Sequence, residues 1–463
     1  MSKDDLTKDF VLGLGVDTFS PANTVKKNSS ILNLCGSKFP WSETRPGTSL
    51  HSTLPGSGTV HGLFVFGHPK SAVTPVLVAG RGGITYVHAG DSWAAVSGGG
   101  SKSTSAYWDA VNFGSSLIIT NGFNVPFDVH VDATYHSVPY STAPVGPFIV
   151  ADTNRIFIAA AFLLSWCMIN IPTDWASTGV DGAGSQTLAQ DTDKPMMALS
   201  DYGGIMVHRE DSIAEMIGLP NSSNVAILEV PTSFGCIAQH SLVRHREKQY
   251  FWGREGIAEV QVGLTPSIIS QPVQYWVDLV NQDATDRICG HLVNDRELWM
   301  AIPTGVSTVP DTILVYDTLL GEWYVYEGIW HPISFIHFNH KDYMLSSDGK
   351  VYELNSGVTD DGTAIAWELV TAALENQGEM KFKRVILGPD AGHFNFQYSP
   401  SVDEDDWSTA VAVTDDSHRL KISLPPTSAD LGYGDYFRMK LSGTGVVSIR
   451  GATLRYRVRS ING

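Results

Sequence analysis

Three short stretches carry side chains of types that bind metals or phosphate or that transfer protons. Asp403–Asp406 is a run of four carboxylates, and calcium prefers several oxygen ligands. The run lacks a glycine turn or alternate spacing, which favours a solvated loop. His331, His337 and His340 lie close together in the sequence, but their surroundings favour core or turn histidines.

The third stretch, residues 97–105, reads SGGGSKSTS and superficially resembles a phosphate-binding loop. Serine, not glycine, precedes Lys102, and no helical pattern follows to supply an N-terminal dipole. The sequence also contains no GxSxG, HExxH, Walker or EF-hand motif. We therefore expect no catalytic residue, no metal site and no cofactor.

Two further segments are candidates for interaction. Arg455, Arg457 and Arg459 share one face of a predicted strand, because strand side chains alternate with a period of two. They form either a solvated, salt-bridged outer face or a basic stripe that faces DNA or an acidic neighbouring subunit.

The second segment is a polar stretch over residues 172–195. A structureless loop of this length is typically functional or mobile. It is our candidate gate or contact loop, and Trp175, Asp181, Gln186 and Asp191 are its candidate residues.

The elements that would position these residues are short β-hairpins. Thr312–Gly357 alternates runs rich in Val, Ile, Tyr, Phe and Trp with tight turns, and predicts a meander the size of one propeller blade. Similar turns lie near residues 83, 122, 211, 256 and 349. Their spacing fits a period of about 45 residues, with unrecognised copies near 167 and 303, and such a period is typical of propellers.

The predicted fold is therefore all-β: a β-propeller of six or seven blades followed by a β-sandwich. From about residue 364 the alternation is strict and no longer follows the 45-residue period. We expect an N-terminal arm over 1–20, the propeller over 21–362 and the sandwich over 363–463. The alternative is an all-β sandwich in which the hairpin spacing is coincidental.

Composition limits the partners. The net charge is −17, and residues 371–463 are neutral, with 11 basic and 11 acidic side chains, so the first 370 residues carry the whole charge. An acidic body binds nucleic acid poorly but suits a surface along which DNA slides. The four cysteines form no CxxC pair and are expected to be small buried residues in a reducing compartment. No signal peptide or membrane-spanning segment is expected.

Several phrases resemble the tail hub, or nozzle, proteins of short-tailed bacteriophages, a group that includes the packaged-DNA stabilisation proteins. Residues 211–260, from DSIAEMIGLP to FWGREGIAEV, are similar to that family's central segment. Residues 296–328 contain a strand, the motif VYD and a Trp in succession, and this order also resembles that family. So do residues 107–126, the RPGT of 45–48 and the closing strands of 436–458.

The resemblance implies a structural protein of the virion tail, made in the host cytoplasm. It implies a propeller-based subunit in a homohexameric ring below the portal and adaptor proteins. That ring retains the packaged DNA, forms the conduit for its ejection and carries fibres or spikes, without catalytic residues. The chain is compact for a nozzle, so the resemblance does not extend to additional fibre-docking domains.

Two alternatives remain open. One is a propeller glycoside hydrolase, which needs two carboxylates converging in a central pocket. The other is a tail-tip receptor-binding module with an exposed aromatic patch.

Overall fold

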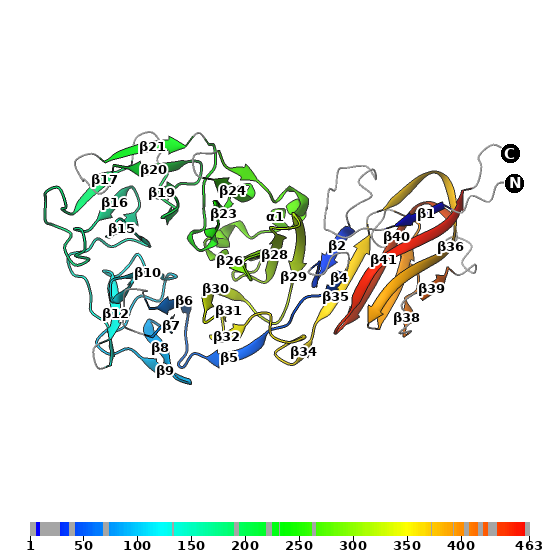
Figure 1. Ribbon diagram of the computed structural model, residues 1–463, viewed down its shortest axis with the longest axis horizontal. Coiled ribbons are helices and arrows are strands. Elements are labelled where there is room, and N and C mark those ends of the chain that lie inside the picture. Colours follow the sequence, from blue (N-terminus) through cyan, green and yellow to red (C-terminus); the bar gives the residue numbers. More distant parts are fainter. Residues whose placement is uncertain are drawn as a thin grey trace.

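A computed structural model shows a ring of four-stranded sheets on one side and a two-sheet lobe on the other (Figure 1). The part of the chain that the structure describes comprises residues 6–9, 28–36, 42–67, 74–131, 134–188, 194–218, 225–230, 232–261, 265–371, 373–391, 393–401, 407–414, 420–424 and 433–458.

The ring is a seven-bladed β-propeller, because six four-stranded antiparallel sheets and a four-stranded antiparallel part of a larger sheet follow one another, and the first strands of most neighbouring blades contact each other. The first six blades are β6 to β9 (Val60–Phe66, Val76–Arg81, Ile84–Ala89, Ser92–Ala95), β10 to β13 (Asp109–Phe113, Ser116–Thr120, Phe127–Val131, Tyr135–His136), β14 to β17 (Phe148–Asp152, Arg155–Ala160, Leu163–Trp166, Gly184–Thr187), β18 to β21 (Ala198–Ser200, Ile205–His208, Ile213–Ile217, Ala226–Val230), β22 to β25 (Val243–His245, Lys248–Gly253, Gly256–Gln261, Ser267–Ile268) and β26 to β29 (Cys289–Val293, Glu297–Ile302, Thr312–Asp317, Glu322–Tyr326).

The seventh blade closes the ring with a strand from the start of the chain. It contains β30 (Pro332–Phe338), β31 (Lys341–Ser346) and β32 (Lys350–Glu353). Its outermost strand is β5 (Ser49–Thr53), which pairs antiparallel with β32. The ring therefore forms only when segments about 300 residues apart in sequence meet.

The repeated turns predicted from the sequence are the connections between the second and third strands of the blades. Gly122 and Gly349, for example, adopt φ values of 73° and 87°, which favour glycine. The two unrecognised copies are the turn after Ala160 in blade 3 and the loop over 303–311 in blade 6. First strands begin 39 to 50 residues apart, at Val60, Asp109, Phe148, Ala198, Val243, Cys289 and Pro332.

The meander over 312–357 is not one blade, which corrects the prediction. Its first two strands, β28 and β29, complete blade 6, and the next three begin blade 7. The segment between them contains Trp330, which is buried, so it is a connection between blades and not a hairpin turn.

The second lobe is a β-sandwich that stacks two sheets. One sheet contains β39 (Leu420–Ser423), β36 (Leu374–Ala391) and β41 (Ser448–Val458). The other contains β35 (Ala366–Thr371), β40 (Tyr433–Thr444), β37 (Phe394–Ser399) and β38 (Val411–Val413). Strand β40 also pairs with β36 and so joins the two sheets.

An aromatic cluster forms the core between the two sheets. Phe437 lies 5.0 Å from Phe382 and 6.2 Å from Tyr398, measured between ring centroids. These three side chains come from both sheets and are buried, so they hold the sheets together by removing large apolar surfaces from water.

The N-terminal strands belong to the sandwich, which differs from the predicted propeller start at residue 21. Strand β1 (Leu6–Asp9), within the predicted arm, pairs with β41, and so does β4 (Ser42–Thr44), the partner of β3 (Leu34–Cys35). Strand β2 (Asn28–Leu32) pairs with β35 on one side and with β29 of blade 6 on the other. One continuous sheet therefore joins the two lobes (Figure 1).

A small insertion between blades 5 and 6 contains η3 (Gln271–Val273), the helix α1 (Gln274–Asp278) and η4 (Gln282–Arg287). Two further short strands, β33 (Thr359–Asp360) and β34 (Thr363–Ala364), lie between the lobes. Within the described ranges, no helix has the length and apolar content needed to cross a bilayer.

Candidate functional site

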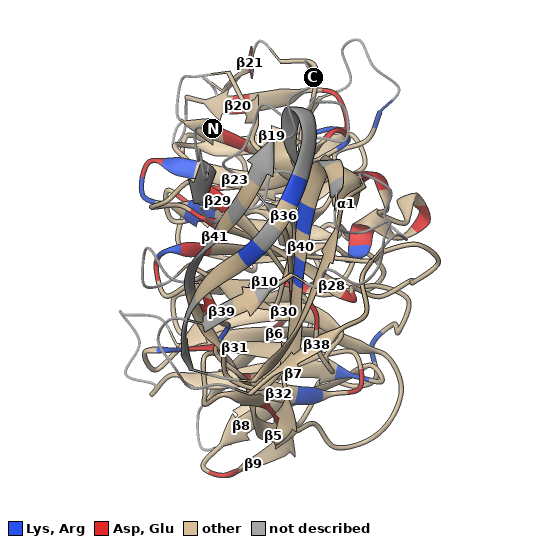
Figure 2. Cartoon of the chain, turned by 90° about the vertical axis from the view of Figure 1, so that its right-hand side faces the viewer, with Lys and Arg blue, Asp and Glu red and all other residues tan. Residues whose placement is uncertain are grey.

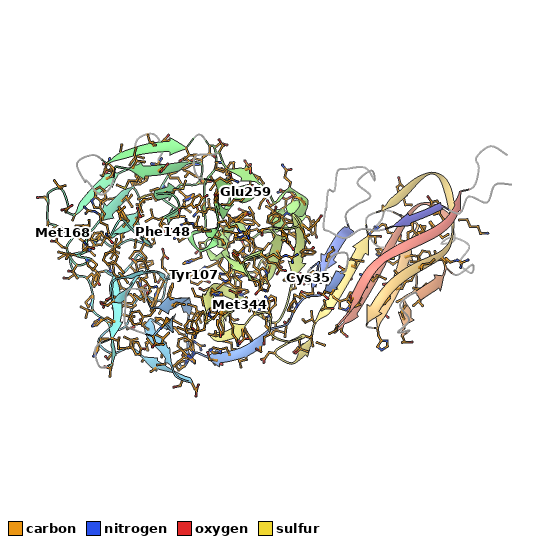
Figure 3. All side chains as sticks on the ribbon, viewed as in Figure 1. Cys35, Tyr107, Phe148, Met168, Glu259 and Met344 are labelled. Atoms are coloured by element: carbon orange, nitrogen blue, oxygen red, sulfur yellow. The ribbon has the colours of Figure 1, made fainter. Side chains whose placement is uncertain are left out.

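The axis of the propeller is crossed by a polar network. Asp109 begins β10, the first strand of blade 2, and Gln239 lies in η2 (Gln239–Ser241), just before blade 5. The amide Nε2 of Gln239 donates a hydrogen bond of 3.2 Å to Oδ2 of Asp109. Blades 2 and 5 are not neighbours, so this bond spans the middle of the ring, where Figure 3 also places Tyr107.

Backbone groups of blade 2 and of the two intervening blades complete this network. The carboxylate of Asp109 accepts hydrogen bonds of 3.0 Å from the N–H groups of Ala110 and of Ile149 in blade 3. The side chain of Gln239 accepts a hydrogen bond of 2.7 Å from the N–H of Leu199 in blade 4 and donates one of 3.1 Å to the carbonyl of Leu199. Two side chains therefore brace four consecutive blades.

The charges at the axis are few. Burial raises the pKa of Asp109 to about 7, and its hydrogen bonds oppose the rise. Burial first, then Arg287, lowers the pKa of His240 to about 4, so this imidazole is neutral at pH 7. Arg287 lies 4.3 Å above the ring of Tyr107 and supplies the positive charge of the cluster.

An acid with a pKa near 7 is suited to proton transfer, but the arrangement limits what Asp109 can do. Its carboxylate already accepts three hydrogen bonds. The only other carboxylate in the first strands of the seven blades is Asp152, at the far end of β14. Asp109 begins its strand and Asp152 ends its strand, so the length of a five-residue strand, about 13 Å, separates the two carboxylates along the strand direction. Paired glycosidase carboxylates lie about 5–9.5 Å apart.

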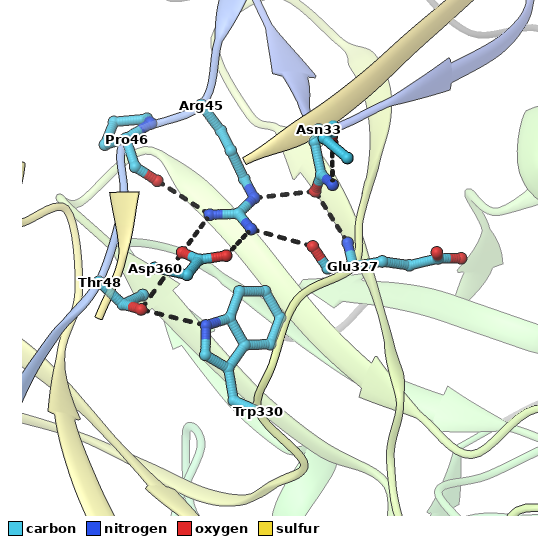
Figure 4. Close-up of polar contacts among 8 residues, drawn as sticks. Asn33, Arg45, Pro46, Thr48, Glu327, Trp330 and Asp360 are labelled. Atoms are coloured by element: carbon cyan, nitrogen blue, oxygen red, sulfur yellow. Dashed lines mark hydrogen bonds and ion pairs between the residues drawn. The ribbon is translucent and has the colours of Figure 1, made fainter. Parts of the chain in front are cut away.

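A second polar cluster joins the propeller to the sandwich, and Figure 4 shows it. The guanidinium of Arg45 forms two hydrogen bonds with the carboxylate of Asp360, of 3.0 and 2.6 Å, and both side chains are buried. Its Nε donates to Oδ1 of Asn33 at 2.8 Å, and Nη2 donates to the carbonyl of Glu327 at 2.9 Å. The ring of Trp330 stacks below, 4.9 Å from the guanidinium carbon.

We call Asn33, Arg45, Thr48, Glu327, Trp330 and Asp360 the clasp. Its members come from the N-terminal segment, from the connection between blades 6 and 7, and from the segment that leads into the sandwich. A buried guanidinium needs this many acceptors, because an unpaired buried charge is costly.

The clasp explains the RPGT motif of residues 45–48. Arg45 supplies the guanidinium, and Thr48 accepts a hydrogen bond from Nε1 of Trp330 at 3.2 Å. Gly47 lies so close to Thr359 that an added Cβ would meet the Thr359 carbonyl oxygen at 2.1 Å. The motif is thus a structural junction, a role that the sequence alone did not indicate.

The candidate gate or contact loop lies at the outer edge of blade 3, and it is not structureless. Gln186 is part of β17, the outermost strand of that blade. Trp175 packs against a core cluster between blades 2 and 3 and donates from Nε1 to the carbonyl of Pro172 at 2.8 Å. Asp181 is exposed, and Asp191 lies outside the described residues. The structure does not bring Trp175, Asp181 and Gln186 into one site.

The predicted arginine stripe lies on β41, and Arg459 falls outside the described residues. Position 455 pairs with Arg384 of β36, and position 457 pairs with Lys381. Lys381 and Arg384 are the basic residues opposite these positions whose side chains the structure describes, and Figure 2 shows basic residues along β36.

The other described residues considered from the sequence have contacts of their own. Oδ1 of Asp342 accepts hydrogen bonds of 2.9 Å from Nδ1 of His337 and from Nε2 of His291 in blade 6. Lys102 lies 4.4 Å above the ring of Phe127, and a strand follows its loop. The run over 403–406 lies outside the described residues. Among the described residues, no group of three or more His, Cys, Asp or Glu side chains could hold a metal ion.

All four cysteines are buried, and none of them forms a disulfide. Burial raises the pKa of Cys167 and raises that of Cys236 to about 12, so these thiols are poor nucleophiles at neutral pH. Their burial agrees with the expectation from the sequence. The residues that sequence reasoning missed are Asp109 and Gln239, which lie 130 positions apart and belong to no motif.

Comparisons with known proteins return propellers and no family. No protein-family model and no curated protein matches the sequence. Similar solved structures include BamB from Moraxella catarrhalis (11% identity, TM-score 0.39, covering 67% of this chain and 97% of that one). Another is the WD40 β-propeller domain of Doa1 (11% identity, TM-score 0.43, covering 66% of this chain and 96% of that one). A third is a catalytically inactive virginiamycin B lyase from Staphylococcus aureus with quinupristin (9% identity, TM-score 0.44, covering 68% of this chain and 99% of that one). We draw no functional conclusion from these similarities, and the propeller assignment follows from the strand pairing.

Proposed function

We propose that this protein is a structural subunit of a bacteriophage tail, a hub or nozzle that assembles as a ring below the portal and adaptor proteins. The ring would retain packaged DNA, form the conduit for its ejection and hold fibres or spikes. The proposal places the protein in the virion tail after synthesis in the host cytoplasm. It starts from the order of motifs described above, one of which, RPGT, forms the clasp.

The observation that carries the proposal is the braced axis of the propeller. The bond between Asp109 and Gln239 crosses the middle of the ring, so a double helix has no path through a single subunit. A conduit built from this chain would have to lie between several copies, as a closed ring of subunits provides. The clasp supports this role, because it fixes the two lobes into one building block.

Charge also supports a conduit. The net charge of −17 disfavours binding to phosphate, so DNA that passes along the carboxylate-rich propeller would not be held there. In this proposal the DNA is a passing cargo without specific contacts, and the homohexamer implied by the resemblance is the expected ring.

The glycoside hydrolase alternative would use Asp109 as its acid, since its pKa is close to neutral. The absence of a second carboxylate at the same end of the first strands disfavours it. A receptor-binding module is the other alternative, and binding of the isolated protein to host cells would support it.

The test is to measure the mass of the purified full-length protein by light scattering, alone and with the portal and adaptor proteins of the same virus. Negative-stain imaging then examines the assemblies. We expect a closed ring of identical subunits with an open lumen. A protein that stays monomeric under both conditions, or that cleaves capsular polysaccharide and loses this activity in Asp109→Asn, would contradict the proposal.

A further inference from the structure

The seam that closes the propeller contains a pair of histidines. His51 lies on β5, the closing strand from the start of the chain, and His88 lies on β8 of blade 1. The centroids of their rings are 5.2 Å apart. Because β5 belongs to blade 7, these two side chains meet where the last blade of the ring joins the first.

A shift in strand pairing accompanies the contact of His51 with blade 1. The pairing of β5 with β32 changes register between Val351 and Tyr352, and the register skips His51. Bulges of this kind re-aim a side chain. Among the described strands, β5 forms a ladder with β32 alone, so side-chain contacts must hold it against blade 1.

Aromatic rings extend the contact on both sides of the pair. His51 lies 4.9 Å from Tyr343 of blade 7, and His88 lies 4.9 Å from Trp93 of blade 1, measured between ring centroids. Burial raises the pKa of Tyr343, so this ring is uncharged at neutral and acid pH. Nε1 of Trp93 donates a hydrogen bond of 3.0 Å to Oγ of Ser52 in β5. The two histidines are therefore the middle members of a row of rings that packs the closing strand onto blade 1.

The acidic side chains near the pair give limited compensation for two added protons. Glu353 of β32 favours a charge on His51, but its carboxylate already forms an ion pair of 2.8 Å with Lys341 of β31. Asp91, in the turn after β8, favours a charge on His88, but it is exposed and therefore screened by water.

Both imidazoles favour the neutral form while the seam is closed. Burial lowers the pKa of His51 from its ordinary value of 6.5; Glu353 opposes the shift and Lys341 adds to it. Burial, followed by the charge of His51, lowers the pKa of His88, and Asp91 opposes the shift. Protons therefore bind the open seam more tightly. The closed seam is fully stable above about pH 6.5 and loses stability as the pH falls below that value.

The chain just after β5 has a separate attachment. Leu54 is buried in the cluster between blades 7 and 1. Its carbonyl accepts a hydrogen bond of 2.8 Å from Nη1 of Arg81 in β7, and its N–H donates one of 2.8 Å to the carbonyl of Gly349. None of these groups titrates between about pH 5 and pH 8, so this anchor persists when the histidines become charged.

We propose that His51 and His88 form a pH-sensitive latch, which releases β5 from blade 1 when both side chains carry a proton. Two like charges then lie side by side, and their repulsion opposes the packing of the row of rings. The anchor at Leu54 limits the release to residues 49–53, so the other blades stay folded. The latch lies within one subunit and does not depend on the assembly proposed above.

The first test is hydrogen–deuterium exchange of the full-length protein, corrected for the intrinsic effect of pH on exchange. Once freed from blade 1, β5 is held by a single ladder and opens more often. We expect the protection of residues 49–53 to fall roughly fivefold between pH 7.5 and pH 5, because two charges about 5 Å apart in water repel by about RT or slightly more. The protection of blade 6 should stay constant.

The second test changes the charge at one position. His88→Phe keeps a ring beside Trp93 and His51 but takes up no proton, so the protection of residues 49–53 should stay nearly constant with pH. His88→Lys carries a charge at every pH tested and should lower this protection already at pH 7.5. The control is His340→Asn, which removes an exposed histidine from the first turn of blade 7. His340 has a φ of 63°, which Asn tolerates, so this variant should behave as the wild type.

Three results would overturn the latch. In the first, the protection of residues 49–53 in the wild type does not change with pH. In the second, it falls as far in His88→Phe as in the wild type, with circular dichroism confirming that the variant is folded. In the third, protection falls equally in all seven blades, which would indicate global unfolding through a buried histidine such as His208 and not release of one strand.

Discussion

At the scale of single residues, Asp109 is the unusual one. Its carboxylate sits where four blades meet, accepts hydrogen bonds from Ala110, Ile149 and Gln239, and has a pKa of about 7 because of its burial. A proton on this group therefore favours the folded protein. The native state binds that proton more tightly than the unfolded chain, in which the pKa is near its ordinary value of 3.8.

The stabilising effect of this proton is complete below about pH 4 and is lost as the pH rises through about 7. We expect Asp109→Asn to unfold at higher denaturant concentration than the wild type at pH 8, with a gain of roughly 1–4 kcal/mol that disappears near pH 4. Urea unfolding at a series of pH values measures the difference.

Asp152→Asn is the matched control, since it removes a carboxylate from the neighbouring first strand. If the stability difference between Asp109→Asn and the wild type is the same at every pH, then Asp109 does not change its protonation on folding.

At the scale of elements, the RPGT segment decides how the N-terminal strands leave the sandwich and enter the propeller. Gly47 and Thr48 run beside the backbone of residues 357–360. The Gly47 N–H donates a hydrogen bond to the Gly357 carbonyl (2.9 Å), and the Thr48 N–H donates one to the Thr359 carbonyl (3.0 Å). Only a residue without Cβ fits at position 47, because the neighbour in contact is backbone and cannot move aside.

We expect Gly47→Ala to destabilise the protein by more than 3 kcal/mol, since the strand leading to β5 must shift. Gly100→Ala is the control. Gly100 has a φ of 60° but open space around its Cβ, so that substitution should cost only about 1–2 kcal/mol. Thermal and urea unfolding of both variants compares the steric conflict in Gly47→Ala with the backbone strain in Gly100→Ala. Equal losses of stability in the two variants would contradict the close contact at Gly47.

The elements themselves were largely predictable, and their partners were not. Turn residues such as Gly122 and Gly349 mark the hairpins locally, so the propeller could be predicted from their spacing. The segment around Trp330 has the composition of a turn, which is why the boundary between blades 6 and 7 was misplaced. The pairing of β2 with β35 and the bond between Asp109 and Gln239 join distant parts of the chain, and no local pattern records them.

At the scale of the whole molecule, the clasp makes two lobes behave as one. Arg45 bonds to Asp360, Asn33 and the carbonyl of Glu327, so separating the sandwich from the propeller would leave a buried charge without its partners. Strand β2 adds hydrogen bonds to both lobes. We therefore expect the wild type to unfold in a single transition.

Arg45→Met keeps much of the side-chain volume but leaves the Asp360 carboxylate buried and unpaired, a loss of about 3–5 kcal/mol. We expect its unfolding to separate into two transitions, which calorimetry can resolve. The control is Arg296→Met, which removes an ion pair with Asp317 inside blade 6 and should lower stability without separating the lobes. A single transition in Arg45→Met would mean that strand pairing alone couples the lobes.

The position of the earliest strands has a consequence for biosynthesis. Strands β1, β2 and β4 leave the ribosome early, yet they pair with β35 and β41 from the C-terminal part of the chain, and β5 must wait for β32. During translation these strands expose unpaired edges, which favour aggregation. Newly made chains would therefore avoid aggregation until translation ends only if chaperones cover these edges or if self-association is slow. Prematurely terminated chains would lack the surfaces required to join an assembly.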